Sequence, residues 1–221
     1  NMKIVKPYAT ILNLHTQESG IVILQSIESI ARVSHRSEER QGEDTWRRFI
    51  LFVVVEKGDW SVTEHEHITV EAVVDRGIQQ EWTRHRIGAY TVESTRFVNY
   101  TKKEMSFICP FTDTDEDEAN KREWIYVMEE CRGSYETLIE RKVPPQIARS
   151  VLPLSTSSKM IVTYNLRMWR HFFLMRTTKE THPQMKQVTI PLLQQFQAYI
   201  PILYDDITPE SRQIDNMNKA H

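Results

Sequence analysis

The clearest alternation of apolar and polar residues lies in the segment His67–Asp75. A period of two places every second side chain on the same face of a strand. The buried face is therefore expected to carry four apolar residues, namely Ile68, Val70, Ala72 and Val74. A second strand is predicted over Met160–Asn165, and the segment Lys3–Leu14 has weaker strand character.

Much of the remaining chain has apolar residues three or four positions apart, which is typical of helices. The predicted helices are Gln25–Val33, Thr45–Lys57, Gly77–Arg84, a long helix from the acidic run at 113–118 to Lys142, Gln146–Val151, Leu166–Arg176, and a last helix from Met185 to Leu203. Helices outnumber strands, and the strands lie at separated points of the chain. This order predicts an α+β fold and not a regular alternation of strands and helices.

Three of these helices carry more specific expectations. The helix Thr45–Lys57 should be largely buried and should end at Gly58. The long helix should open with a capping box formed by Asp113 and Glu116, and Pro191 should kink or interrupt the last helix. The long helix should also bury one apolar stripe, consisting of Trp124, Val127, Cys131, Tyr135 and Leu138.

Composition indicates a globular chain that folds as one domain over residues 1–221. Hydrophobic residues make up 40% and charged residues 26% of the sequence, which excludes a disordered protein. The strongest uncharged apolar run, Phe49–Val55, is too short to span a membrane, and the first residues lack the apolar stretch of a signal peptide. Two cysteines, Cys109 and Cys131, fit a reducing compartment, so a cytoplasmic location is expected without membrane attachment.

The charge distribution directs attention to small anionic ligands. A net charge of −2 produces no global field that would attract nucleic acid, yet arginines cluster locally. The densest cluster follows the predicted helix 77–84 and contains Arg84, His85, Arg86, Ser94 and Arg96. Arginine binds phosphate oxygens with a planar pair of donors, so these residues suit a phosphate ligand or, alternatively, form a solvated basic surface. Since the chain has neither a G-x-G-x-x-G motif nor a P-loop, side chains would have to hold any nucleotide.

The segment Arg84-His85-Arg86, followed by Ser94, resembles the signature of the flavin-dependent thymidylate synthase (ThyX) family. Further segments occur in the family's order and spacing, and the resemblance covers about residues 27 to 190. These segments are Ala31-Arg32-Val33-Ser34, Ser61 to His65, Glu81-Trp82-Thr83, Ala148 to Pro153, Asn165-Leu166-Arg167 and His171 to Arg176.

The resemblance implies a central, mostly antiparallel sheet flanked by helices. It also implies that dUMP is converted to dTMP, with 5,10-methylenetetrahydrofolate as carbon donor and NADPH-reduced FAD as hydride donor. A homotetramer with active sites between its subunits is expected on the same ground. No nucleic acid, membrane or metal ion is expected to take part.

The resemblance further assigns residues to these ligands. The FAD-binding residues would be Ser34, Ser61, Arg84, His85, Arg86, Glu93, Asn165, Arg167 and His171. The dUMP-binding residues would be Glu81, Arg84, Glu93, Ser94, Thr95, Arg96, Arg149 and Arg176, of which Ser94 and Arg176 would be catalytic. The acidic residue of Thr91-Val92-Glu93 stands one position later than is common in the family, so the roles of Val92, Glu93 and His182 stay open.

Other functions fit parts of the sequence. His65 and His67 lie two residues apart and could form a metal pair, which with His85 would suggest a metal-dependent hydrolase. Ser94 with His85 as its base could form a nucleophilic pair, although no G-x-S-x-G motif accompanies it. An RNA-binding module that uses the arginines without catalysis is a further alternative. Neither cysteine has a catalytic context, unlike the thiolate of conventional thymidylate synthases.

Overall fold

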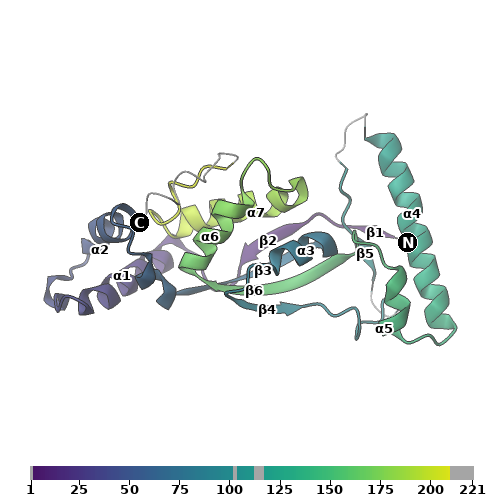
Figure 1. Ribbon diagram of the computed structural model, residues 1–221, viewed down its shortest axis with the longest axis horizontal. Coiled ribbons are helices and arrows are strands. Elements are labelled where there is room, and N and C mark those ends of the chain that lie inside the picture. Colours follow the sequence, from purple (N-terminus) through teal and green to yellow (C-terminus); the bar gives the residue numbers. More distant parts are fainter. Residues whose placement is uncertain (1, 102–103, 112–116, 210–221) are drawn as a thin grey trace. The chain divides into compact units, whose positions relative to one another are not determined.

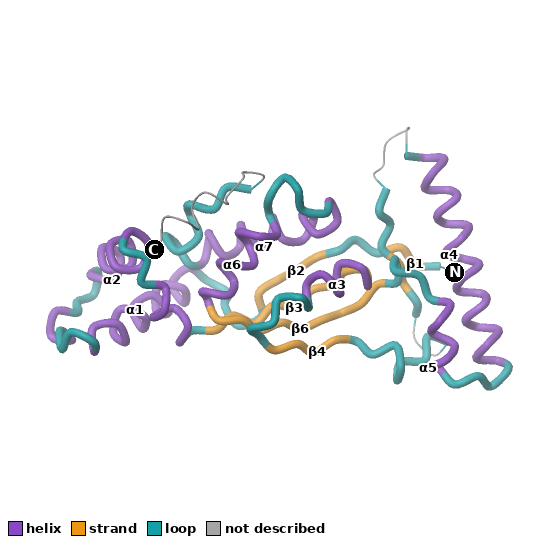
Figure 2. Tube along the Cα trace, in the orientation of Figure 1, coloured by secondary structure: helices purple, strands orange, loops and turns teal. Residues whose placement is uncertain are grey.

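A four-stranded sheet with the order β2-β3-β6-β4 organises the computed structural model, which describes residues 2–101, 104–111 and 117–209 (Figures 1 and 2). The strands are β2 (Tyr8–Ile11), β3 (His67–Asp75), β4 (Ala89–Val92) and β6 (Ser157–Asn165). A smaller parallel sheet pairs β1 (Lys3–Ile4) with β5 (Ser106–Phe107). The helices are α1 (Gln17–Val33), α2 (Thr45–Phe49), α3 (Arg76–Trp82), α4 (Glu118–Glu140), α5 (Pro145–Ala148), α6 (Leu166–Arg176) and α7 (Pro183–Tyr199).

Neighbouring strands of the larger sheet run antiparallel where their contacts define the direction. The hydroxyls of Thr69 and Thr163 lie 2.9 Å apart, and the Arg76 amide donates to the Thr156 carbonyl at 3.2 Å, so β3 and β6 run in opposite directions. Strand β4 is antiparallel to β6, because Glu93 pairs with Lys159 whereas Gly88 lies against Thr163. The predicted α+β class with a mostly antiparallel sheet is confirmed.

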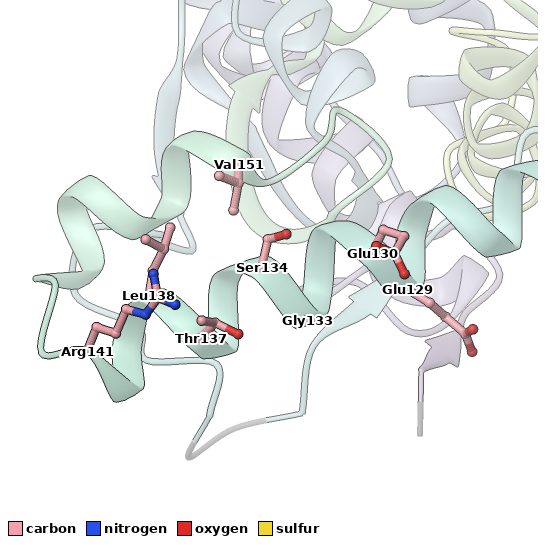
Figure 3. A pocket seen from close by; sticks show the side chains of 8 residues that line it. All are labelled: Glu129, Glu130, Gly133, Ser134, Thr137, Leu138, Arg141 and Val151. Atoms are coloured by element: carbon pink, nitrogen blue, oxygen red, sulfur yellow. The ribbon is translucent and has the colours of Figure 1, made fainter.

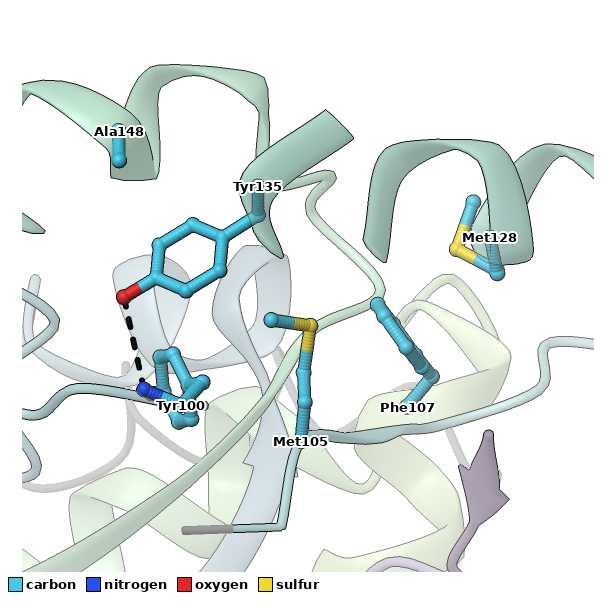
Figure 4. Close-up of a cluster of buried hydrophobic side chains, with 6 residues drawn as sticks. All are labelled: Tyr100, Met105, Phe107, Met128, Tyr135 and Ala148. Carbon is cyan, nitrogen blue, oxygen red and sulfur yellow. Dashed lines mark hydrogen bonds between the residues drawn. The ribbon is translucent and has the colours of Figure 1, made fainter. Parts of the chain in front are cut away.

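The first of two compact units comprises the described residues within 1–8, 72–84 and 90–161. It contains α3, α4, α5, the two-stranded sheet and a 3-10 turn at Arg149–Val151. Its core joins α4 and α5 to the segment after β4 (Figure 4). The buried side chains of this core are Tyr100, Met105, Phe107, Met128, Tyr135 and Ala148.

The second unit comprises the described residues within 9–71, 85–89 and 162–221. It contains α1, α2, a π-helical segment Ile50–Glu56, a 3-10 turn Trp60–His65, α6 and α7. Helix α6 packs on β3 through Trp169, whose indole N–H donates to the Ile68 carbonyl at 2.9 Å. An aromatic cluster fills this core with Tyr164, Trp169, Phe172, Phe173, Phe196 and Tyr204.

Side-chain caps explain where several helices begin. Thr16 accepts from the Ser19 amide at the start of α1, and Asp75 accepts from the Ile78 amide at the start of α3. Asn165 caps α6 in the same way, which separates β6 from α6 at the boundary expected from the sequence. Helix α7 starts at Pro183, after the His182 cap, and continues through Pro191. Of the two effects expected of that proline, a kink or an interruption, the interruption does not occur.

Several expectations about helices need correction. Helix α1 begins eight residues before the predicted Gln25. The segment Thr45–Lys57 is helical but changes to a π-helix, and it buries only Trp46, Ile50 and Val54. On α4, Met128 is buried instead of the expected Val127, which is 40% exposed, and Cys131 is only half-buried. The capping box of Asp113 and Glu116 lies outside the described residues.

Among the described residues, no helix combines the length and the apolar character that crossing a membrane requires.

Candidate active site

Arg176, the last residue of α6, contacts the Arg-His-Arg segment with its cationic side chain. The Arg176 Nε donates a hydrogen bond to His85 Nε2 over 2.9 Å. Both residues belong to the second unit, although 91 positions separate them in the sequence. An arginine side chain has donors only, so His85 must present an unprotonated Nε2 to it.

His85 is held in its neutral form. His85 as a whole residue is 8% exposed, and Phe172 lies edge-on against its ring with the ring centres 5.0 Å apart. Burial, the Arg176 cation and His171 together lower the pKa of His85 from 6.5 to about 4. His171, whose ring centre is 5.9 Å from that of His85, also has a lowered pKa because of burial and the Arg176 charge. At neutral pH His85 therefore accepts hydrogen bonds at Nε2 and carries no positive charge.

The chain leaves the Arg-His-Arg segment through a close contact with β6. A Cβ atom at Gly88 would lie 2.1 Å from the Tyr164 ring and 2.9 Å from the Thr163 carbonyl oxygen. Only glycine leaves room for this approach, so Gly88 sets the path by which the segment enters β4.

The other predicted FAD-binding residues of the second unit lie just after α1, at the boundary between β6 and α6, on α6, and in the turn before β3. Ser34 ends α1 and donates to the Ala31 carbonyl, and Ser61 donates to the Asp59 carboxylate at 2.7 Å. Asn165 uses its side-chain oxygen to cap α6. Arg167 forms an exposed ion pair with Glu64, with 2.6 Å between Nη1 and Oε1.

Arg84 and Arg86 differ from Arg167 in having no acidic partner. Both side chains are exposed, and in the described part of the chain neither forms an ion pair or a side-chain hydrogen bond. Arg84 is tied to the end of α3 only through its amide, which donates to the Glu81 carbonyl at 3.2 Å. Guanidinium groups left without a carboxylate are suited to an anionic ligand.

A pocket of about 400 Å³ lies within the first unit, next to the predicted phosphate-binding arginines. Arg149 Nη1 donates to the Thr95 hydroxyl at 3.2 Å, and Arg96 Nε donates to the Gln146 side-chain oxygen at 3.2 Å. The residues that line the pocket are Arg76, Thr95, Gln146, Arg149, Ser150 and Leu152. Two cations with hydroxyl and amide groups around one hollow provide the donors that a phosphate group requires.

Glu93 and Ser94 directly precede Thr95 of this pocket in the sequence, and each forms a hydrogen bond with a residue outside the pocket lining. The Ser94 hydroxyl accepts from the Arg96 amide at 3.3 Å. The Glu93 carboxylate accepts from the Tyr100 hydroxyl at 3.0 Å. Burial and the negative charge of Glu93 raise the pKa of Tyr100, so this phenol stays protonated and keeps donating. Glu81 is half-buried in the last turn of α3.

The predicted residues thus form two sets. The first unit holds Glu81, Arg84, Glu93, Ser94, Thr95, Arg96 and Arg149, and the second holds Ser34, Ser61, His85, Arg86, Asn165, Arg167, His171 and Arg176. Within the first, Arg149 contacts Thr95 directly; within the second, His85 contacts Arg176 and His171.

Sequence reasoning missed three polar residues of the pocket. Arg76, Gln146 and Ser150 line it together with Thr95 and Arg149. Arg76 stands directly after the apolar strand β3, and a charged residue at a strand end was the signal that could have identified it. Gln146 and Ser150 flank Arg149 on a short helical segment and carried no such signal.

The alternatives drawn from the sequence gain little support. His65 ends a 3-10 turn and His67 begins β3, and among the described residues no group of three His, Cys, Asp or Glu side chains could hold a metal ion. His85 uses Nε2 for Arg176, so that atom is not available to activate Ser94.

A second pocket, of about 490 Å³, lies along α4 and contains none of the predicted residues (Figure 3). Glu129 and Glu130 stand at one end of it, and Arg141 lies beside Leu138 at the other.

Comparison with known proteins shows the family to which the chain belongs. The model of the family described as "Thymidylate synthase complementing protein" matches residues 23–202. The flavin-dependent thymidylate synthase of Corynebacterium aurimucosum is 30% identical over 175 residues, which cover 71% of this chain and 68% of that protein. The probable flavin-dependent thymidylate synthase of Mycobacterium phage D29 is 29% identical over 167 residues, 71% of each chain.

A solved structure has the same fold. The UMP/dUMP methylase PolB from Streptomyces cacaoi, bound with 5-Br dUMP, superposes with a TM-score of 0.77 at 20% identity and covers 93% of this chain and 95% of its own. With the family model and the curated relatives in agreement, the chain belongs to the flavin-dependent thymidylate synthase family.

Proposed function

We propose that this protein converts dUMP to dTMP, taking the carbon from 5,10-methylenetetrahydrofolate and releasing tetrahydrofolate. FAD, reduced by NADPH, supplies the hydride that completes the methyl group. Membership of the family supports this reaction, as do relatives named for it. The observation in the structure that carries the proposal is the arginine-lined pocket of the first unit, which suits the phosphate of a nucleoside monophosphate.

The side chains of this pocket are assigned to the phosphate group of dUMP. Arg149 already donates to Thr95, which is buried, and Arg96 is held by Gln146. Donors fixed in advance lose little freedom when the ligand binds. Each charge-assisted hydrogen bond to the phosphate contributes about 1.5–3 kcal/mol. Arg76 adds a second cation to the lining and is assigned to the same group.

The donor set of the Arg-His-Arg segment fits FAD. The cofactor carries a pyrophosphate, and Arg84 and Arg86 are exposed guanidinium groups without acidic partners in the described chain. We assign Ser34, Ser61, Arg84, His85, Arg86, Glu93, Asn165, Arg167 and His171 to the cofactor. Arg167 would exchange its exposed bond with Glu64 for a ligand phosphate, since exposed ion pairs are weak.

Arg176 is assigned to the uracil ring. A fixed cation stabilises negative charge that develops on the pyrimidine during carbon transfer. The assigned nucleotide-binding residues are completed by Glu81, Arg84, Glu93 and Ser94. Ser94 and Arg176 are assigned to catalysis. The Tyr100 bond orients the Glu93 carboxylate for this task.

The assembly and location follow the same family expectation. We propose a homotetramer with active sites between subunits, built from one domain over residues 1–221, that works in the cytoplasm with dUMP, folate and NADPH as its ligands.

The absorption spectrum of the purified protein tests the function. A flavin band should remain after FAD is added and the protein is desalted, and NADPH should bleach it without oxygen at a rate that changes with dUMP. The Arg176→Ala variant should stay folded and yellow but lose about 10²–10³ in the rate of dTMP formation. Colourless protein that binds RNA, with an affinity that falls steeply with salt, would instead favour the RNA-binding alternative.

A further inference from the structure

The contact between Arg176 and His85 fixes the direction of a guanidinium group. The bond is made at Nε, the nitrogen inside the side chain, over 2.9 Å. A guanidinium is planar, so an acceptor at Nε sets the plane in which both Nη groups lie. The orientation of Arg176 towards any ligand therefore depends on the position of His85.

The backbone end of Arg176 is fixed independently. Thr189 on α7 donates its hydroxyl hydrogen to the Arg176 carbonyl at 2.6 Å. With α7 holding the backbone and His85 holding Nε, the long side chain is restrained at both ends. An unrestrained arginine would lose rotamer entropy when it binds a ligand.

His85 is suited to act as an acceptor and not as a cation. Three groups from α6 surround its ring, namely the cation of Arg176, the imidazole of His171 and the apolar ring of Phe172. All three disfavour a positive charge on His85, and its lowered pKa of about 4 agrees with this environment. The lone pair on Nε2 is therefore present throughout the neutral pH range.

We propose that His85 is a positioning residue for Arg176: by accepting the Nε hydrogen bond, it aims the guanidinium at the pyrimidine ring of the nucleotide. This inference rests on the proposed function, because it requires that Arg176 binds dUMP. The inference differs from an assignment of His85 to the flavin alone. If His85 acted only as a ligand of the flavin, replacing it would weaken the binding of FAD and not that of dUMP.

Three variants separate these roles. In His85→Gln, the amide oxygen reaches about as far as Nε2 and can still accept from Arg176. In His85→Asn, the same amide is one methylene shorter and falls short of Nε. In His85→Phe, the ring packing against Phe172 is kept but the acceptor is lost.

The experiment measures the dissociation constant of dUMP by calorimetry on FAD-loaded protein, without folate or NADPH. We expect His85→Gln to stay within about threefold of the unmodified protein, and His85→Asn and His85→Phe to bind dUMP about tenfold more weakly. FAD affinity, measured by fluorescence titration of the flavin-free protein, should fall by similar factors, within about threefold of one another, in all three variants, because each removes the imidazole that is assigned to the cofactor. In turnover, the KM for dUMP should rise in His85→Asn while the KM for NADPH stays constant.

A double-mutant cycle tests whether the effect passes through Arg176. In the Arg176→Ala background, replacing His85 by Asn should alter dUMP affinity by less than about twofold, because the partner is already absent. Should His85→Phe fail to fold, the pair His85→Gln and His85→Asn, with this cycle, carries the test alone.

The outcomes distinguish the inference from the proposed function. If the unmodified protein binds FAD but no dUMP, both fail. If the unmodified protein binds dUMP and all His85 variants match it, the positioning role alone is overturned. Additive effects in the cycle, or a loss confined to FAD affinity, would likewise overturn it and leave His85 with its assigned cofactor role alone.

Discussion

Replacing Gly20 by alanine should destabilise the second unit, although alanine is the better helix former. A Cβ atom at Gly20 on α1 would lie 1.7 Å from the carbonyl oxygen of Tyr199 at the end of α7. A carbon and a carbonyl oxygen need about 3.3 Å, so the two helices would have to separate by about 1.6 Å. The backbone oxygen cannot rotate away as the end of a flexible side chain could.

The magnitude follows from the packing that this separation disturbs. Overpacking costs about 1–3 kcal/mol and exceeds the gain in helix propensity. In a chain of this length we expect the midpoint of thermal unfolding to fall by about 2–12 °C. Differential scanning calorimetry at a fixed protein concentration measures this change.

Gly133 on α4 provides the matched control. A Cβ atom there meets nothing within 4 Å, so Gly133→Ala should raise the midpoint by about 1–4 °C through helix propensity alone. Shifts in opposite directions would support the reasoning. A Gly20→Ala variant at least as stable as the unmodified protein would refute the close contact between α1 and α7.

Two further predictions concern the ligand sites. Arg149→Ala should raise the KM for dUMP about 10- to 100-fold in steady-state assays. Arg141→Ala, in the pocket on α4, is the control and should leave this KM unchanged. Equal effects of the two substitutions would contradict the role of Arg149 in binding the phosphate. The pKa of His85 in the folded protein lies below its unfolded value of 6.5, so between these two values the unfolded chain binds one more proton than the folded chain. The stability that neutral His85 provides above pH 6.5 is therefore lost as pH falls towards 4. Unfolding midpoints measured across this range should therefore fall more steeply for the unmodified protein than for His85→Gln, and parallel curves would contradict the lowered pKa.

The spacing of apolar residues along the chain was enough to predict elements whose limits and buried faces depend on neighbouring residues in the sequence. The alternating face of β3 is buried as predicted, and α6 has the predicted bounds because Asn165 caps its first turn. The Arg-His-Arg segment and Arg149 were also recognisable, since their chemistry is evident from residue type and spacing.

Elements that depend on distant partners were predicted less well. Strand β4 has no alternating apolar pattern and exists because its backbone pairs with β6. Helix α1 starts earlier than predicted, and the added first turns contain Gly20, a poor helix former in isolation that permits the contact with α7. On α4, the choice of Met128 over Val127 depends on which side faces Met105 and Phe107.

The sequence by itself determined the fold class, the family and the residue types available for binding anions, because these follow from local pattern and motif spacing. The tertiary structure alone decided that Arg76 lines the same hollow as Arg149, and that Arg176 donates to His85. The physical reason is that a hydrogen bond depends on the positions of two atoms in space. No periodicity records the distance between residues that are 91 positions apart.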